Sequence, residues 1–224
     1  MEPIVSNEFE FRQCIGLTKS TGQRACTLRE LRDLIATIST ESIFHHTYQY
    51  FLKGHSLEYT NDFGHWAGEC LEERALSEYL CNIDIFAFTE INDLRNEILG
   101  QIDIYLDTFP EPRNALPGDE FYFNETVSFV FPVGIRARNL AEFLMAIKHV
   151  DQGCIYYHFY LARKRLGQDA GDFATWIKDT LKKEELAARI ASIDPFMLNI
   201  ENIRYDIIEY IEEEVYNDME TVGR

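Results

Sequence analysis

Several features are missing from the sequence, and each absence excludes a class of protein. No apolar run approaches the roughly 18 residues that cross a membrane. The opening residues, Met-Glu-Pro-Ile-Val-Ser-Asn-Glu, lack the basic and apolar regions of a signal peptide. Basic residues are scarce, and the formal net charge of −17 repels nucleic-acid phosphates and anionic lipids. We therefore expect neither a nucleic-acid partner nor a membrane partner.

Cysteine pairs and reactive motifs are also missing. Disulfide frameworks and structural zinc sites need paired cysteines, but the five present contain no C-x-x-C. We expect free thiols in the cytoplasm. The sequence has no G-x-S-x-G, P-loop or G-x-G-x-x-G motif, and no carboxylate pair stands out as acid and base. Nothing indicates a catalytic residue or a cofactor, so an enzymatic activity is uncertain and not favoured.

The chain instead contains an internal repeat. Residues 9–48 align without a gap with residues 121–160, and 11 of these 40 pairs are identical. The match continues, two residues shorter, from Asp62 and Asp172 onward. A fixed long period predicts two copies of one module. We expect a first module at residues 8–109, a proline-rich linker at 110–119, a second module at 120–219 and a tail at 220–224.

The patterns predict a mainly α protein with a small β element (α+β), in which a pseudo-twofold axis relates two helical modules of about 110 residues. Each copy opens with an alternating strand pattern, and Gly22 and Gly134 are expected to end a turn. Residues 127–133 are almost all apolar, which predicts burial on both faces. Because two strands are marginal alone, we expect those of both copies to form one small sheet.

The rest of each copy shows helical spacing. Apolar residues recur at three and four residues in 28–38 and 140–150, with Thr27 and Asn139 at the N-cap positions. A second helix is expected after Ser39 and after Asp151. A third is expected at Asp62 and at Asp172, which we predict as its caps. A fourth and a long fifth helix follow in each copy.

Five sequence strings resemble an uncharacterised bacterial and archaeal family, domain of unknown function 5752. They are Leu28-Arg-Glu-Leu31, Ser42-Ile-Phe-His-His46, Asn61-Asp-Phe-Gly-His-Trp66, Ala75-Leu-Ser-Glu-Tyr-Leu80 and Ile83-Asp84, with Tyr156-Tyr-His-Phe159 and Asp172-Phe-Ala-Thr-Trp176 in the second copy. The resemblance covers nearly the whole chain. It implies a mostly helical module with no assigned activity. It also implies a neighbourhood of carbohydrate-active enzymes, and hence a protein partner rather than a reaction.

A His-x-Tyr pair present in both copies is the sharpest candidate site. Together with a tryptophan from each copy it forms an aromatic group that could line a pocket for a sugar or a cation: His46, Tyr48, Trp66, His158, Tyr160 and Trp176. The alternative is a core histidine that hydrogen-bonds to Asp62 or Asp172. A metal site is not favoured, because His45 and His46 are adjacent and point about 100° apart on a helix. His55 and His65 complete the four histidines of the first copy.

The second copy also carries a basic island, from Arg163 to Arg165. It either captures a phosphate or acidic segment, or forms a solvated helix face. We interpret the protein as a non-catalytic binding or adaptor module, with a protein partner and with oligomers allowed. The alternative is a small-molecule protein or enzyme for a carbohydrate or phosphorylated metabolite, using His158 and the basic island.

Overall fold

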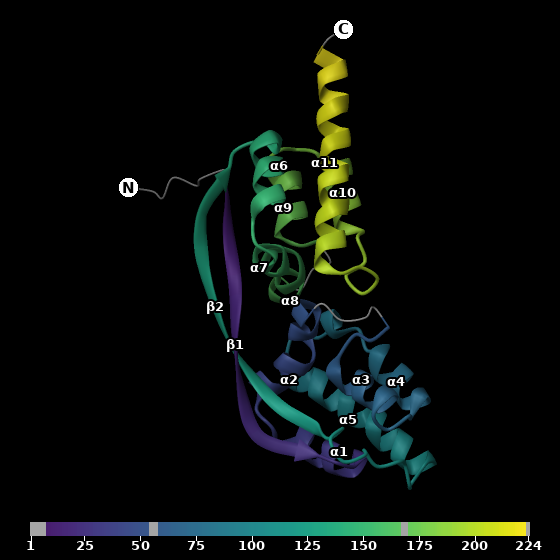
Figure 1. Cartoon of the computed structure of the whole chain (residues 1–224). Coiled ribbons are helices and arrows are strands. Elements are labelled where there is room, and N and C mark those ends of the chain that lie inside the picture. Colours follow the sequence, from purple (N-terminus) through teal and green to yellow (C-terminus); the bar gives the residue numbers. More distant parts are fainter. Residues whose placement is uncertain (1–7, 54–57, 167–169, 223–224) are drawn as a thin grey trace. The chain divides into compact units, whose positions relative to one another are not determined.

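The computed structural model describes residues 8–53, 58–166 and 170–222, and helices predominate in it (Figure 1). The two strands, β1 (Phe9–Ala25) and β2 (Phe121–Ala137), pair in one antiparallel two-stranded sheet. Two predictions are thereby confirmed: the mainly helical α+β class, and the single sheet formed by one strand from each half.

Helices follow each strand in a similar order. The helical elements of the first half are α1 (Leu28–Thr37), α2 (Thr40–His46), the 3₁₀ helix η1 (Tyr48–Lys53), α3 (Asp62–Glu69), α4 (Arg74–Cys81), the 3₁₀ helix η2 (Ile85–Ala87) and α5 (Ile91–Thr108). Those of the second half are α6 (Leu140–His149), α7 (Gln152–Ile155), the π-helix η3 (Tyr156–Leu161), α8 (Ala162–Leu166), α9 (Asp172–Asp179), α10 (Glu184–Ala191) and α11 (Ile200–Val222). Residues 109–120, which include the expected linker, lie in no helix or strand. His55 lies outside the described residues.

Side-chain caps fix several helix starts. The Thr27 hydroxyl accepts a hydrogen bond from the Glu30 N–H at 3.1 Å, and the Glu30 carboxylate accepts one from the Thr27 N–H at 3.2 Å, which completes a capping box. Asn139 caps α6 by accepting from the Glu142 N–H at 2.9 Å. Both N-caps were expected from the sequence.

The expected caps of the third helices are wrong by one residue. Asn61 is the N-cap of α3 and accepts from the Gly64 N–H at 2.8 Å, while Gly171 holds the N-cap position of α9. Asp62 and Asp172 are the first helical residues instead. Because an acidic side chain in the first turn is favoured by the helix dipole without serving as the cap, both carboxylates are left available for other partners.

Two compact units are formed, and each contains part of both strands. One unit consists of Met1–Ile15 with Phe129–Arg224, and the other of Gly16–Ser128. Their boundaries therefore differ from those expected for the repeats, 8–109 and 120–219. In the first unit, the start of β1 packs against helices that lie more than a hundred residues later in the sequence.

Aromatic side chains at the start of each strand fill the core of a unit. In the first unit the Phe9 ring lies 5.4 Å from Phe143 and 5.5 Å from Trp176, between ring centroids. In the second unit the Phe121 ring lies 5.3 Å from Phe63 and 5.8 Å from Trp66. The first residues of each strand thus complete a core whose helices belong to the other half of the sequence.

Gly22 and Gly134 do not end a turn, contrary to the prediction. They lie inside β1 and β2, with φ of +76° and +78°. Glycine adopts this left-handed conformation without the steric penalty of a Cβ atom, so each strand continues past its glycine.

The predicted burial of residues 127–133 is also wrong. Residues 127–132 are all exposed, and only Val133 is partly covered. The middle of a two-stranded ribbon has no third strand beside it, so apolar composition alone does not bury it.

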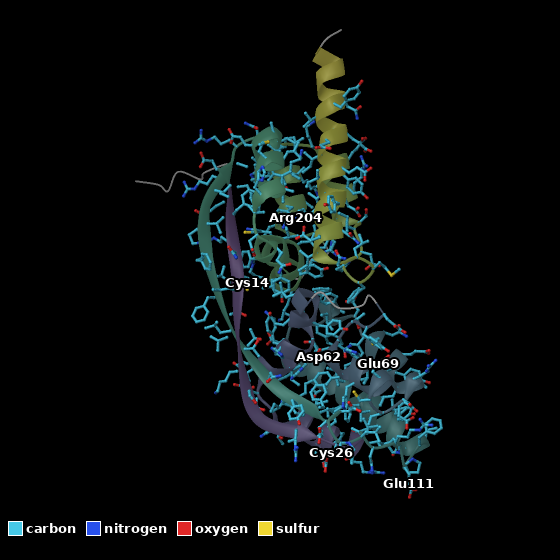
Figure 2. All side chains as sticks on the ribbon, viewed as in Figure 1. Cys14, Cys26, Asp62, Glu69, Glu111 and Arg204 are labelled. Atoms are coloured by element: carbon cyan, nitrogen blue, oxygen red, sulfur yellow. The ribbon has the colours of Figure 1, made fainter. Side chains whose placement is uncertain are left out.

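The five cysteines are free thiols, as expected. Cys14 and Cys154 are buried, and Cys26, Cys70 and Cys81 are partly exposed. Figure 2 labels Cys14 and Cys26 among the side chains. Among the described helices, none combines the length and the apolar character that a membrane crossing requires.

Candidate functional site

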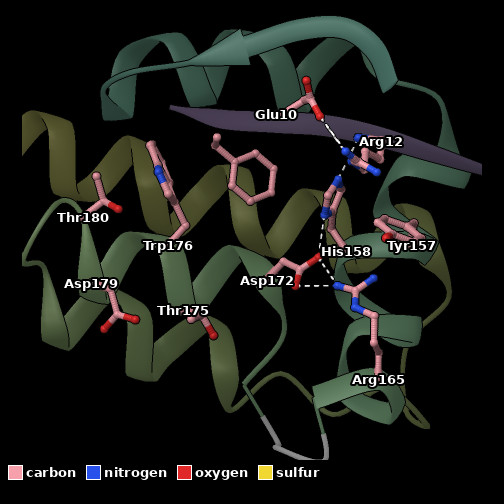
Figure 3. Close-up of a pocket in the computed structure, with 11 residues that line it drawn as sticks. Glu10, Arg12, Tyr157, His158, Arg165, Asp172, Thr175, Trp176, Asp179 and Thr180 are labelled. Carbon is pink, nitrogen blue, oxygen red and sulfur yellow. Dashed lines mark hydrogen bonds and ion pairs between the residues drawn. The ribbon is translucent and has the colours of Figure 1, made fainter. Parts of the chain in front are cut away.

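The candidate site is an open pocket of about 460 Å³ in the unit that contains the second half. The start of β1, the π-helix η3, α8 and α9 surround it (Figure 3). The side chains that line it are Phe9, Glu10, Arg12, Tyr157, His158, Arg165, Asp172, Thr175, Trp176, Asp179 and Thr180.

His158 lies at the buried centre of this pocket and connects β1 to α9. Its Nε2 atom accepts a hydrogen bond from the Arg12 backbone N–H at 2.8 Å. Since Nε2 is an acceptor, the proton of the neutral ring is on Nδ1, which donates to Asp172 Oδ2 at 2.8 Å. Both ring nitrogens are therefore used, and the ring fastens the strand to the helix.

Burial keeps this histidine neutral. Desolvation lowers the pKa of His158 below its usual value, although the hydrogen bond to Asp172 opposes the change. Burial alone would raise the pKa of Asp172, but the hydrogen bonds from His158 and Arg165 outweigh it and hold that pKa below its usual value. A neutral imidazole beside an ionised carboxylate agrees with the acceptor role of Nε2.

Two arginines at the edge of the pocket are paired with carboxylates. The Arg165 guanidinium donates to both oxygens of Asp172, at 2.7 and 2.6 Å, and lies 4.6 Å from the centre of the Tyr157 ring. Arg12 donates to Glu10 at 3.0 and 3.2 Å. The two pairs place both hydrogen-bond donors and acceptors at the edge of the pocket.

The same strand-to-helix connection occurs around His46 in the other unit. Its Nε2 atom accepts from the Asn124 N–H at 3.0 Å, and its Nδ1 atom donates to Asp62 at 2.7 Å. The alternative that these histidines are core groups hydrogen-bonded to Asp62 and Asp172 thus describes their geometry.

His45, His46 and Asp62 form a cluster whose potential ligand atoms lie within 4.8 Å of one another. A metal ligand must offer a free lone pair, but the Nε2 lone pair of His46 accepts the strand N–H. The Nδ1 atom of His45 lies 2.5 Å from the Thr126 hydroxyl. A metal ion here would have to break the connection between strand and helix.

Of the eight residues named as candidates from the sequence, three line the pocket and five do not. His158, Arg165 and Trp176 line it. Tyr48 and Tyr160 are buried, and their hydroxyls donate to the carbonyls of Ile85 and Pro195. The remaining three, His46, Trp66 and Arg163, also form hydrogen bonds within the protein.

Trp66 donates its indole N–H to the Asp119 carbonyl at 2.7 Å. Arg163 is buried, donates to the carbonyls of Ala191 and Ile193, and lies 4.3 Å from the centre of the Phe159 ring. The basic island is therefore split, with Arg163 inside the fold and Arg165 at the pocket. His46, described above, is also buried.

Other pocket residues were not recognised in the sequence, among them Arg12, Tyr157, Thr175 and Asp179. None belongs to the features that both copies retain, which selected the aromatic candidates, or to the basic island, which selected Arg163 and Arg165. A signal was present nonetheless, because these positions differ between the copies and therefore are not required by both.

The Cys154 thiol does not provide a nucleophile in this unit. Burial raises the pKa of the Cys154 thiol to about 11, so that it stays protonated near neutral pH. Chemically, the pocket can bind a small molecule by hydrogen bonds and aromatic packing, and its histidine is already occupied as donor and acceptor.

Comparison with known proteins places the chain in a family. A family model described as a family of unknown function (DUF5752) matches residues 6–212. The chain belongs to the DUF5752 family. This confirms the resemblance noted in the sequence.

A solved structure gives this DUF5752 member a structural relative. It is similar to OrfY from Thermoproteus tenax, with 30% sequence identity and a TM-score of 0.72, and the match covers 92% of this chain and 94% of that one. No curated protein matches the chain.

Proposed function

We propose that this protein is a non-catalytic binding or adaptor module in the cytoplasm, built from two copies of one helical unit, and that it binds a protein partner through an apolar patch on β2. Three observations support the proposal: equivalent contacts in the two halves, the internal use of the candidate reactive groups, and the exposure of the patch.

Equivalent contacts support the duplication. His46 and His158 each accept a strand N–H and donate to an aspartate. The turn after the third helix contains a left-handed residue in both halves, Glu72 with φ of +56° and Lys182 with φ of +60°. From their sixth residue on, the burial patterns of β1 and β2 are identical. The pseudo-twofold relation between the copies stays a prediction.

An exchange of residue size between the halves gives the duplication a test. A Cβ atom on Gly64 would lie 2.3 Å from Cys81 Sγ, too close for any stable contact. The equivalent residues of the second half are Ala174 and Ala191. We expect Gly64→Ala alone to lower the free energy of unfolding by about 2 kcal/mol through overpacking.

The double variant Gly64→Ala/Cys81→Ala is expected to recover most of that loss, because it reproduces the pair found in the second half. Denaturant unfolding of the wild type, both single variants and the double variant measures the coupling, expected at about 1–2 kcal/mol. Additive losses would show that the two helix pairs are not packed alike and would count against the duplication.

The internal use of the shared histidines and tyrosines supports a non-catalytic role. The histidines and tyrosines that both copies retain are used by the fold, as described above. A general base needs a lone pair within reach of a substrate proton, and the Nε2 lone pair of His158 is occupied by the Arg12 N–H. The hydrogen bonds that these histidines and tyrosines form within the fold therefore explain why both halves contain them.

The exposed patch on β2 carries the proposal. It consists of Phe129, Val130, Phe131 and Ile135, with exposed fractions of 47%, 43%, 39% and 38%. All four lie in the unit that contains the second half. Phe129 and Phe131 lie on one face of the strand and Val130 on the other, so that apolar side chains are exposed on both faces of this ribbon. Exposed apolar surface of this kind marks interaction surfaces on soluble proteins.

The corresponding stretch of β1 shows that folding does not require an apolar surface there. At the positions equivalent to Val130, Phe131 and Ile135, β1 carries Thr18, Lys19 and Gln23, in a strand with a similar burial pattern. Of the four patch positions, that of Phe129 alone is also apolar in β1, as the exposed Leu17. The apolar residues of β2 therefore serve something other than the fold. A partner with a complementary apolar surface, such as a carbohydrate-active enzyme, fits this patch.

The test replaces the patch by the residues of β1, in the triple variant Val130→Thr/Phe131→Lys/Ile135→Gln. Affinity capture from the source organism is measured for this variant and for the wild type. We expect the wild type to retain one protein in stoichiometric amount and the variant to lose it by more than about ten-fold, since buried apolar anchors dominate such interfaces.

A matched control removes three other exposed apolar side chains of the same unit, with Met145→Thr, Met197→Lys and Tyr205→Gln. It should retain the partner. Equal capture by the patch variant and the control would contradict the proposal. Sedimentation velocity of the purified protein identifies the case in which the partner is a second copy.

A further inference from the structure

The pocket around His158 has features that the fold does not require. Four features of its lining bear on what it binds: the face of α9, the charges, the aromatic surface and the differences from the other half.

One face of α9 is directed into the pocket. Asp172, Thr175, Trp176, Asp179 and Thr180 line it, at spacings of three, four, seven and eight residues from Asp172. This spacing places them on one side of the helix (Figure 3). As an amphipathic helix does, α9 buries Phe173, Ala174 and Ile177 on its other side, and it presents two carboxylates and two hydroxyls to the open cavity.

The charges of the lining disfavour an ionic ligand of either sign. Glu10, Asp172 and Asp179 are acidic, and Arg12 and Arg165 are basic. Four of these groups form the two ion pairs described above, and Asp179 has none among the described residues. Asp179, unpaired in the part of the chain that the structure describes, repels an anion, and the guanidinium groups of Arg12 and Arg165 repel a cation that comes close to them, whereas a neutral ligand can donate a hydroxyl to Asp179 without meeting a like charge.

Both donors and acceptors are present in this lining. Guanidinium N–H groups donate, carboxylates accept, and threonine and tyrosine hydroxyls do both. A ligand rich in hydroxyl groups satisfies both kinds, because each hydroxyl donates and accepts. The partly exposed Tyr157, together with the small exposed parts of Phe9 and Trp176, adds an apolar surface on which the C–H face of a ring can pack. The volume of about 460 Å³ lies in the usual range for small-molecule sites.

The lining is specialised relative to the other half, an argument that depends on the duplication proposed above. Arg12, Tyr157 and Thr175 correspond to Asn124, His45 and His65. The backbone differs as well: Tyr157 and His158 lie in the π-helix η3, whereas the equivalent His45 and His46 are the last residues of the α-helix α2. Such π-helical turns are rare and frequently occur at functional sites. This one places Tyr157 and His158 in the pocket.

We propose that the pocket between β1, η3 and α9 binds a neutral, hydroxyl-rich molecule of the sugar class. Asp179 and Thr180 hold its hydroxyls, and the aromatic side chains pack against its ring. Binding involves no covalent step. The site is separate from the β2 patch, so that either proposal can fail alone.

Nuclear magnetic resonance of the ¹⁵N-labelled chain tests this proposal with an internal control. The protein has two tryptophans, Trp176 in the pocket and Trp66 in the other unit, so that their indole signals report on two places. Glucose, maltose and sucrose are titrated, and glucose 6-phosphate and protonated glucosamine serve as charged analogues. We expect a neutral sugar to shift the Trp176 signal in a saturable manner while the Trp66 signal stays in place.

Asp179→Asn and Thr180→Val are each expected to weaken this binding by about ten-fold, because the first replaces a charged acceptor oxygen by an amide NH2 donor and the second removes a hydroxyl from the pocket. The matched control is Glu209→Gln, an exposed carboxylate on α11 outside the pocket. The proposal is overturned if no neutral sugar shifts the Trp176 signal, if a charged analogue binds more tightly than the neutral sugars, or if the control weakens binding as much as the pocket variants.

Discussion

A fragment that consists of residues 16–128 is expected to fold in isolation, whereas fragments 8–109 and 120–224 are expected to be unfolded. The first fragment is one whole compact unit with its own parts of both strands. The other two are the repeats as the sequence defines them, and each lacks the strand segment that completes a core. Circular dichroism with thermal denaturation distinguishes a cooperative transition from its absence.

The energetics of the missing segment explain the size of this effect. Fragment 120–224 lacks Phe9 and Phe11, which are 7% and 0% exposed in the intact protein. Burial of each phenylalanine contributes about 1.5–3 kcal/mol. The strand partner of Phe129–Ala137 is lost as well. The free energy of unfolding of a domain of this size is only about 5–15 kcal/mol in total, so the stabilisation lost with this segment approaches the total stability.

Complementation provides the control. A peptide with the sequence of residues 8–15 should restore a cooperative transition to fragment 120–224 at sufficient concentration, by mass action. A peptide in which both phenylalanines are replaced by alanine should not. A fragment 120–224 that melts cooperatively by itself would contradict the division into units that share their strands.

Sequence reasoning found the helices and the shared sheet, but it did not find which helices the start of each strand packs against, for a physical reason. Helix starts depend on local groups, so Thr27 and Asn139 were recognisable as caps from their neighbours alone. The alternation in residues 9–15 shows that one face is buried, but it does not say which helices cover it. That choice depends on contacts distant in sequence, such as Phe9 with Trp176.

The candidate site was predicted in part for the same reason. The pairing of His158 with Asp172 was among the alternatives, because both copies retain these residues at similar spacing. Arg12 entered the site only because β1 crosses to α9 and the helices around it. The apolar residues of β2 were expected to be buried, since composition does not reveal that a ribbon has only two strands.

His158→Phe is expected to lower the free energy of unfolding by about 3 kcal/mol while leaving most of the aromatic packing in place. The new ring can keep the contacts that His158 makes with Phe9 and Phe173, at centroid distances of 4.8 and 5.4 Å. It cannot accept the Arg12 N–H or donate to Asp172, and an unpaired buried polar group costs about 1–3 kcal/mol. Denaturant unfolding at neutral pH measures the difference. His149→Phe, at an exposed position of α6, should change it by less than about 0.5 kcal/mol.

The pH dependence of this difference separates the hydrogen-bonding role from simple packing. Burial lowers the pKa of His158 in the folded state, so the unfolded chain binds more protons as the pH falls below about 6.5. The stability that the neutral ring contributes is therefore complete above that pH and decreases as the pH falls toward the folded-state pKa. The wild type should lose stability over this window more steeply than His158→Phe, which has no proton to bind there. Parallel pH profiles would show that the neutral ring does not fasten β1 to α9. The lower free energy of unfolding of the variant would then come from altered packing alone.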